Sequence, residues 1–534
     1  MGPHGSEPLH RVRIDTYIFF FVLFGLVVFL SHLPFLSLPY YWDEAGQFIP
    51  SALDIFREGQ WIPHSAVPSI HPPAVMAYLA ACWKVAGFHT VVTRSALLLV
   101  AAFAVLAAFL LAIELSKEVR GAPAFLAVTL LCVSPLFFAQ AMLAQLDAPA
   151  MLFTTLALLL FLQDHIALCA VVTVVLVMVK ETGLVAPLVF ALWLAHERRW
   201  RDMLIFAAPA VALGFWVAIL FHQTGHWTGN AEFLRYNLYF QLHPVRLAVT
   251  FLRRLYFLFI ANFHWVGTLA IVYAWRRTRV FPARRWQIAW WMVAAHVVML
   301  TVLGGAALER YLLPVLPIVF AAMAASLTVL PRLPRLAFSV VLVAGLAAGN
   351  FVNPPYPFPY ENNLAVTDFL SLQAETAAYL SQWYPQARIS TVWPLTMELA
   401  RPVLGFTSQA LEVQPLPDFS LRTLNSLDWS RVQVFVLYSR DWDPPFNLVH
   451  YTSVKDFWKR FYGYVPNASM SEGRARVPFP LAADFERRGQ WVDVYVNPAF
   501  LRVHPGVETV EKRAPLLRGR SAGGTHPGLG RKTL

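Results

Sequence analysis

Two adjacent carboxylates, Asp43 and Glu44, follow the first apolar run of the chain in the stretch "YYWDEAGQF". At the mouth of a membrane helix, such a pair could take a proton from a substrate hydroxyl or bind a divalent cation through its oxygen atoms. Acidic residues also favour the start of a helix, where their role is only structural. The pair by itself leaves all three interpretations open.

More ionisable residues stand at the ends of later apolar runs. Asp147 is a lone carboxylate in "AMLAQLDAPAMLF", and Lys180 and Glu181 interrupt "VMVKETGLVAP". Glu309 and Arg310 open the run "LERYLLPVLP". Asp147 could cap the helix that follows it. Ionisable groups close to membrane depth are costly, however, and usually mark a functional site.

The composition predicts that the bilayer surrounds the elements that carry these residues. The 534 residues are 57% hydrophobic and 14% charged, whereas a soluble protein carries about a quarter charged residues. The formal net charge is +11, but the basic residues cluster between apolar runs. Positive-inside topology explains that clustering, so we exclude a nucleic-acid partner.

The apolar runs predict an α-helical polytopic membrane protein with about 11 transmembrane helices. The first run has no small-residue cleavage site after it, and we expect it to remain as a helix. The expected spans are residues 14–35, 91–114, 123–140, 147–163, 166–180, 183–196, 203–221, 255–274, 287–304, 311–330 and 335–350.

The basic residues between the runs predict the orientation. With the N-terminus in the cytoplasm, nearly every basic cluster between spans falls on the cytoplasmic side. These clusters contain Arg11, Arg13, Lys117, Arg120, Arg198, Arg199, Arg201, Arg276, Arg277, Arg279, Arg284, Arg285, Arg332 and Arg335. The first long loop, residues 36–90, then lies outside. The ionisable residues at the ends of the runs converge on that same outer face.

The composition changes after Asn350, where "NPPYPFPYENN" leaves the membrane. Residues 351–503 mix helical segments with the strand candidates "ARISTVWP", "VQVFVLYS" and "WVDVYVNP", which predicts a small extracytoplasmic α/β domain. Residues 504–534 are basic and glycine-rich without an apolar period, and we expect a disordered tail there.

Taken together, these motifs resemble the GT-C membrane glycosyltransferases, in particular bacterial relatives of the protein O-mannosyltransferases and of the aminoarabinose transferase that acts on lipid A. The resemblance covers about residues 10–350. It rests on the Asp-Glu pair after the first helix, "SIHPPAVMAYL", the lone aspartate, the Lys-Glu pair, the Arg-Tyr-x-x-Pro segment and the C-terminal outer domain.

The resemblance implies a role for each matching residue. The catalytic base of the family maps onto Asp43, with Glu44, Asp147 and Glu181 as supporting or metal-binding groups. A divalent cation (Mg, Mn or Zn) would be held by Asp43 and Asp147.

The donor phosphate would contact Arg310, Lys180 and His71. The aminoarabinose transferase has Glu-Lys before its Pro-Pro, where this chain has Ile70-His71. His71 could take over the phosphate contact, or only begin a helix.

The implied activity is transfer of a hexose or pentose from a polyprenyl-phosphate-linked donor to an acceptor hydroxyl, with inversion. The acceptor is a protein, a lipid or a glycan, and the active site faces outward from the plasma (inner) membrane. The alternatives are a transporter or flippase for polyprenyl-linked glycans, and an inactive scaffold. A transporter should place its binding groups near the midplane of the bilayer, where this sequence has almost none.

Overall fold

The computed structural model describes residues 14–117, 119, 123–304, 308–444 and 451–503. The predictions for Arg11, Arg13, Arg120 and the tail 504–534 lie outside the described residues. The described chain forms two compact units, the first up to Val366 together with Asp443–Gly463, and the second from Thr367 to Trp442 and from Tyr464 onward.

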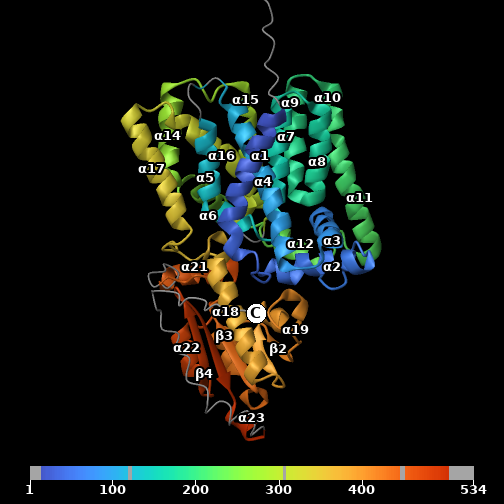
Figure 1. Cartoon of the computed structure of the whole chain (residues 1–534), viewed down its shortest axis with the longest axis vertical. Coiled ribbons are helices and arrows are strands. Elements are labelled where there is room, and N and C mark those ends of the chain that lie inside the picture. The colour runs from blue at the N-terminus through green and yellow to red at the C-terminus, as the bar shows by residue number, and fades with distance from the viewer. Residues whose placement is uncertain (1–13, 118, 120–122, 305–307, 445–450, 504–534) are drawn as a thin grey trace, which may run out of the picture. The chain divides into compact units, whose positions relative to one another are not determined.

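The first unit is a bundle of helices (Figure 1). Its α-helices are α1 (Ile14–His32), α2 (Ile49–Glu58), α3 (Ala74–Ala86), α4 (Thr90–Leu115), α5 (Pro123–Val133), α6 (Pro135–Gln140), α7 (Asp147–Leu162), α8 (Ile166–Val179), α9 (Val185–His196), α10 (Trp200–Ile205), α11 (Ala207–Thr224), α12 (Ala231–Leu234), α13 (Pro244–Phe259), α14 (His264–Arg277), α15 (Arg284–Leu303), α16 (Leu316–Leu327), α17 (Arg332–Gly349) and α21 (Thr452–Tyr462). Single 3-10 or π turns connect them, namely η1 (Leu33–Phe35), η2 (Glu44–Phe48), η3 (Glu181–Leu184), η4 (Arg235–Tyr239), η5 (Glu309–Val315) and η6 (Tyr360–Asn362).

Burial separates the inner helices of this bundle from the outer ones. Helices α4 and α16 are largely buried, whereas α1, α11 and α17 expose apolar side chains. In Figure 1, α17 and α11 lie at opposite edges of the bundle. Large apolar side chains on an outer face, such as Phe215 (70% exposed) and Leu333 (78% exposed), fit lipid as their solvent.

Among the described residues, six helices are long and apolar enough to cross a membrane, or seven if the bent pair α13 and α14 counts as one span. The predicted count of eleven spans is larger, because it includes several apolar runs that form helices of only 10–17 residues. A 16-residue helix such as α7 is about 24 Å long, shorter than the roughly 30 Å hydrocarbon core. The run 123–140 is also divided, since Ser134 is extended and Pro135 begins a new helix.

The second unit contains a mixed five-stranded sheet of order β2-β1-β3-β5-β4. Strands β1 (Ile389–Val392), β2 (Val413–Leu416) and β3 (Val434–Tyr438) are parallel, and β5 (Gln490–Val496) pairs antiparallel with β3 and with β4 (Leu481–Arg487). The helices are α18 (Ala365–Trp383, which begins in the first unit), α19 (Leu395–Ala400), α20 (Leu421–Ser426), α22 (Met470–Arg476) and α23 (Pro498–Val503), with 3-10 turns η7 (Pro402–Leu404) and η8 (Trp429–Arg431). The segments at 389–392, 434–438 and 490–496 are strands, as the sequence predicts, and β1 and β3 are buried throughout.

Close packing of α14 on α16 gives a stability test. A Cβ atom added at Gly267 would lie 2.4 Å from the Sδ atom of the fully buried Met323, whereas one at Gly214 on α11 would meet nothing within 4 Å. We expect Gly267→Val to lower the free energy of unfolding by about 1–3 kcal/mol, the usual cost of overpacking. Gly214→Val is the matched control and should change it little. Equal melting temperatures for both variants in detergent would contradict this packing.

Candidate active site

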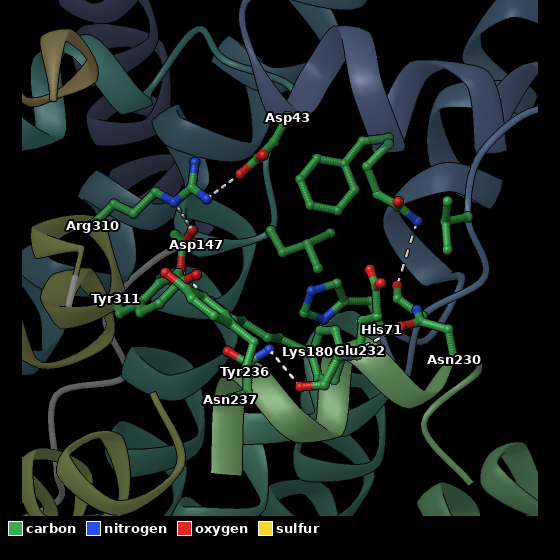
Figure 2. Close-up of a pocket in the computed structure, with 16 residues that line it drawn as sticks. Asp43, His71, Asp147, Lys180, Asn230, Glu232, Tyr236, Asn237, Arg310 and Tyr311 are labelled. Atoms are coloured by element: carbon green, nitrogen blue, oxygen red, sulfur yellow. Dashed lines mark hydrogen bonds and ion pairs between the residues drawn. The ribbon is translucent and has the colours of Figure 1, made fainter. Parts of the chain in front are cut away.

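The predicted chemical residues lie at the ends of helices. Asp43 precedes η2, Asp147 is the first residue of α7, and Lys180 ends α8 in an extended conformation. Arg310 lies in η5, immediately before α16. At a helix end, a charged side chain can meet partners from other segments without interrupting an apolar helix. Figure 2 shows that these four residues approach one another although they are distant in sequence.

The guanidinium of Arg310 is the centre of this cluster. Its Nη2 donates to Asp43, its Nη1 donates to Glu361 at 2.8 Å, and its Nε lies 3.4 Å from Asp147 Oδ2. Lys180 Nζ donates to the other oxygen of Asp147 at 2.5 Å and lies 4.1 Å from the ring centre of Tyr311. Two cations therefore meet three carboxylates in a region of low dielectric, where such contacts are strong.

Asp43 differs from the other acids of the cluster in exposure. Its side chain is 32% exposed, whereas Asp147 and Glu361 are each 3% exposed. Asp43 is thus the carboxylate that a ligand can reach.

Asp43 faces a cavity of about 330 Å³, shown in Figure 2. The polar residues that line it are Asp43, Gln47, Ser69, His71, Asp147, Lys180, Asn230, Glu232, Tyr236, Asn237, Arg310 and Tyr311. His71 Nδ1 lies 2.9 Å from Glu181 Oε2, so Glu181 orients the imidazole. The contribution of residues 230–237 was not predicted, because polar and aromatic residues are common in loops.

Glu44 does not line the cavity, although the sequence places it beside Asp43. It is fully buried, and its two oxygens accept from Arg94 Nη1 at 2.5 Å and Nη2 at 3.0 Å. It also accepts from the backbone N–H groups of Tyr41 (2.8 Å) and Ala144 (2.5 Å). Arg94 donates further to the carbonyls of Pro39 and Met142. This pair joins the chain before Asp43 to the chain before Asp147.

Arg94 and Glu361 were both missed from sequence. Arg94 interrupts the 26-residue apolar helix α4, and that interruption was the pattern that could have identified it. Glu361 follows the proline-rich exit after α17, where a glutamate is unremarkable in type and spacing.

The predicted metal ligands are already neutralised by side chains. Asp43 accepts from Arg310, and Asp147 lies against both Arg310 and Lys180. A divalent cation there would lie beside two fixed positive charges, so this donor set does not fit a resident metal ion.

Among the described residues, the group with ligand atoms close enough for a metal is Asp54, Glu58 and His64, none of which lines the cavity. Asp54 accepts there from the backbone N–H groups of His64 (2.9 Å) and Ser65 (3.0 Å), which is the role of a loop-closing carboxylate.

Comparison of the fold with solved structures finds clear matches. ArnT from Cupriavidus metallidurans bound to undecaprenyl phosphate matches 91% of this chain and 99% of its own length, with a TM-score of 0.51 and 14% identity. The apo state of the same protein matches 90% of this chain and 98% of its own, with a TM-score of 0.53 and 13% identity. The oligosaccharyltransferase of Archaeoglobus fulgidus matches more weakly, with 78% and 67% covered, a TM-score of 0.43 and 11% identity.

No protein-family model matches the sequence, and no curated protein matches it. The likeness is therefore one of fold. The predicted resemblance to the GT-C glycosyltransferases is confirmed at that level, and the chain has the GT-C fold.

The buried pair of Glu44 and Arg94 should be essential to folding. Arg94→Met leaves an unpaired buried carboxylate, and we expect a loss of about 3–5 kcal/mol in the free energy of unfolding. Arg199→Met, which removes a surface pair with Asp164 and Asp202, should cost about 0–1 kcal/mol. The double variant Glu44→Gln/Arg94→Met should recover part of the loss, because an amide oxygen still accepts from the backbone. A loss no greater than that of Arg199→Met would contradict this account.

Glu361 should give the unfolding equilibrium a pH dependence. Burial raises the pKa of its carboxyl from 4.5 to about 7, against the opposing effect of Arg310. The folded state then binds more protons than the unfolded state between these values, so stability from this group falls as the pH rises from 4.5 to 7. Glu361→Gln stays neutral throughout. Its melting temperature should rise relative to wild type between pH 5 and about pH 7.5. If the melting temperatures of the two proteins followed parallel curves against pH, Glu361 would not be the source of the pH dependence.

Proposed function

We propose that this chain, with its GT-C fold, transfers a sugar from a polyprenyl-phosphate-linked donor to an acceptor hydroxyl, with inversion at the anomeric carbon. The single observation that carries the proposal is the cavity in which one accessible carboxylate, Asp43, lies beside two cations, Arg310 and Lys180. A base and a cationic phosphate site side by side are what such a transfer requires.

Arg310 and Lys180 are suited to hold the donor phosphate. A guanidinium gives a bidentate contact and an ammonium a point charge. The flat face of Tyr311 lies against both cations, 4.1 Å from Lys180 Nζ and 5.5 Å from Arg310 Cζ, and limits how far they can turn. ArnT, which shares the fold, binds undecaprenyl phosphate, and this supports a lipid-linked donor here.

Donor binding would also activate the base. Without a donor, Asp43 accepts a hydrogen bond from Arg310 and is not free to meet an acceptor hydroxyl. A phosphate that takes Nη2 of Arg310 would release Asp43, while Glu361 on Nη1 and Asp147 near Nε keep the guanidinium in place. Asp43 would then face the acceptor hydroxyl only when a donor is present.

The chemical step is a single displacement. The acceptor oxygen attacks the anomeric carbon while the bond from that carbon to the phosphate oxygen breaks. The hydroxyl proton passes to Asp43, and the phosphate leaves with the bonding electrons against Arg310 and Lys180. Asp147 is engaged by both cations and acts as their counterion rather than as a nucleophile.

We place the cavity on the extracytoplasmic side of the plasma membrane. The basic loops at 117, 198–201 and 284–285 lie at the end of the bundle opposite α2 and α3 (Figure 1). Arg284 pairs there with Glu197 at 2.6 Å, and Arg285 donates to the carbonyl of Glu114. Positive-inside topology assigns that end to the cytoplasm.

Asp43→Asn tests the proposal directly. We expect transfer of radiolabelled sugar from polyprenyl-phosphate donors to fall by about 10²–10⁴-fold, because general-base catalysis is lost. The donor should still bind, and no more weakly, because a neutral amide competes less than a carboxylate with the phosphate for Arg310. The melting temperature should change little, since Asp147 and Glu361 still pair with Arg310. The matched control is Asp164→Asn, an exposed acid paired with Arg199.

Transfer by Asp43→Asn at the wild-type rate would exclude Asp43 as the base. Faster movement of donor lipid across the bilayer without transfer by either protein would favour a flippase instead.

A further inference from the structure

A second cavity adjoins the one that contains Asp43. Its volume is about 540 Å³, and it is lined by Glu232, Arg235, Tyr236, Tyr239 and Phe240. Glu232 and Tyr236 also line the first cavity. The second cavity therefore continues outward from the reacting groups along α12 and η4.

Three rings in this cavity form what we call the aromatic platform, namely Tyr236, Tyr239 and Phe240. Tyr236 is 52% exposed and Tyr239 62% exposed. Phe240 is stacked with Tyr236, with ring centres 6.0 Å apart and planes at 17°, and the guanidinium of Arg246 lies 3.8 Å over the Phe240 ring. The platform thus has a fixed base and two open rings.

The segment that carries the platform is fixed at both ends. Asn230 caps α12 through Phe233 N at 2.7 Å and donates to the carbonyl of Pro68 at 2.7 Å. Gly229 has a φ of +81°, and a Cβ atom there would lie 2.7 Å from the same carbonyl, so only glycine permits this approach. At the other end, Gln241 donates to Gly304 O at 2.8 Å. A platform held in this way loses little entropy when a ligand binds.

We propose that the aromatic platform binds the acceptor, and that the acceptor is a neutral oligosaccharide whose terminal hydroxyl enters the cavity beside Asp43. This inference rests on the proposed glycosyl transfer and names its acceptor class. A sugar ring has an apolar C–H face, which packs on an open aromatic ring, and a rim of hydroxyl groups. Glu232 accepts hydrogen bonds from such hydroxyls and Arg235 donates to them.

The lining of the second cavity favours this ligand over other acceptors. Glu232 and Arg235 have opposite charges, so the cavity offers no net charge to a phosphorylated glycolipid or a charged peptide. None of the described residues that line it is aliphatic, which leaves an acyl chain without partners. Strand addition to an extended peptide needs a sheet edge, and the first unit has no strand among its described residues.

The test uses the full chain in detergent and the variant Tyr239→Ala. Trp227→Ala is the matched control, because Trp227 is 61% exposed on the same loop but stacks on Phe221 at 4.2 Å and lines neither cavity. The probes are a panel of linear neutral hexasaccharides (α-glucan, β-glucan, α-mannan and α-arabinan), a Ser/Thr-rich peptide and a diphosphorylated glycolipid. Binding is measured by calorimetry. Hydrolysis of the donor, in which water takes the place of the acceptor hydroxyl at the anomeric carbon, is measured separately as donor cleavage without acceptor.

We expect at least one hexasaccharide to bind, with an affinity about tenfold lower for Tyr239→Ala and unchanged for Trp227→Ala. Donor cleavage without acceptor should be equal in all three proteins. No hexasaccharide binding, or binding that is insensitive to Tyr239, overturns the inference, as does Tyr239-dependent binding of the peptide or the glycolipid. Equal losses in both variants would mean that the rings only anchor the loop at the bilayer surface, which also overturns it.

Failure of the proposed function would look different. The donor would then remain uncleaved in every protein, while a Tyr239-dependent affinity for a hexasaccharide could still be measured.

Discussion

The candidate site depends on one buried cation. Arg310 lies in an apolar bundle, where an unpaired guanidinium is prohibitively costly, so the fold must bring carboxylates to it. Asp43, Asp147 and Glu361 come from three different parts of the chain to meet that requirement. Neutralising this charge and assembling the site are therefore the same event.

The ion pair of Glu44 and Arg94 holds the backbone around the site in a similar way. It is fully buried, and its hydrogen bonds to backbone groups at 39, 41, 142 and 144 fix the segments that precede Asp43 and Asp147. Two neighbouring carboxylates thus have separate duties. Glu44 faces inward and positions the backbone, which leaves Asp43 free to face the cavity. An acidic pair at a helix mouth is explained by this division of roles.

The charges in the first cavity explain how a donor phosphate could bind beside the proposed base. Two cations that share three carboxylates can exchange one carboxylate partner for a phosphate without leaving either cation unpaired. Of these three described carboxylates, Asp43 is the one exposed enough to be released, and it is the group proposed to act as base. The neutral, aromatic second cavity then complements the charged first one, because the donor carries the charge and the acceptor hydroxyl does not.

The sequence by itself determined the class of protein and which residue types were available. Long apolar runs, basic clusters between them and ionisable residues at their ends are read directly from the chain, because the bilayer and its potential act on local composition. The strands at 389–392, 434–438 and 490–496 were likewise predicted, the one at 434–438 because buried strands are near-continuous apolar runs. The motifs also predicted the GT-C fold, which the structural likeness to ArnT confirms.

Only the tertiary structure decided which charged side chains pair with one another and how long each helix is. Asp43 and Glu44 are adjacent in sequence, yet Glu44 is buried and Asp43 faces the cavity. This difference depends on Arg94, about fifty residues away, which pairs with Glu44. Glu361 has no distinguishing pattern, yet it completes the charge shell of Arg310. The predicted count of eleven spans exceeds the six or seven helices of spanning length among the described residues. Short apolar helices buried in a bundle have the same composition as helices that cross the membrane. The composition of a segment indicates whether lipid, protein or water surrounds it. Which side chains pair across the fold depends instead on which segments pack together.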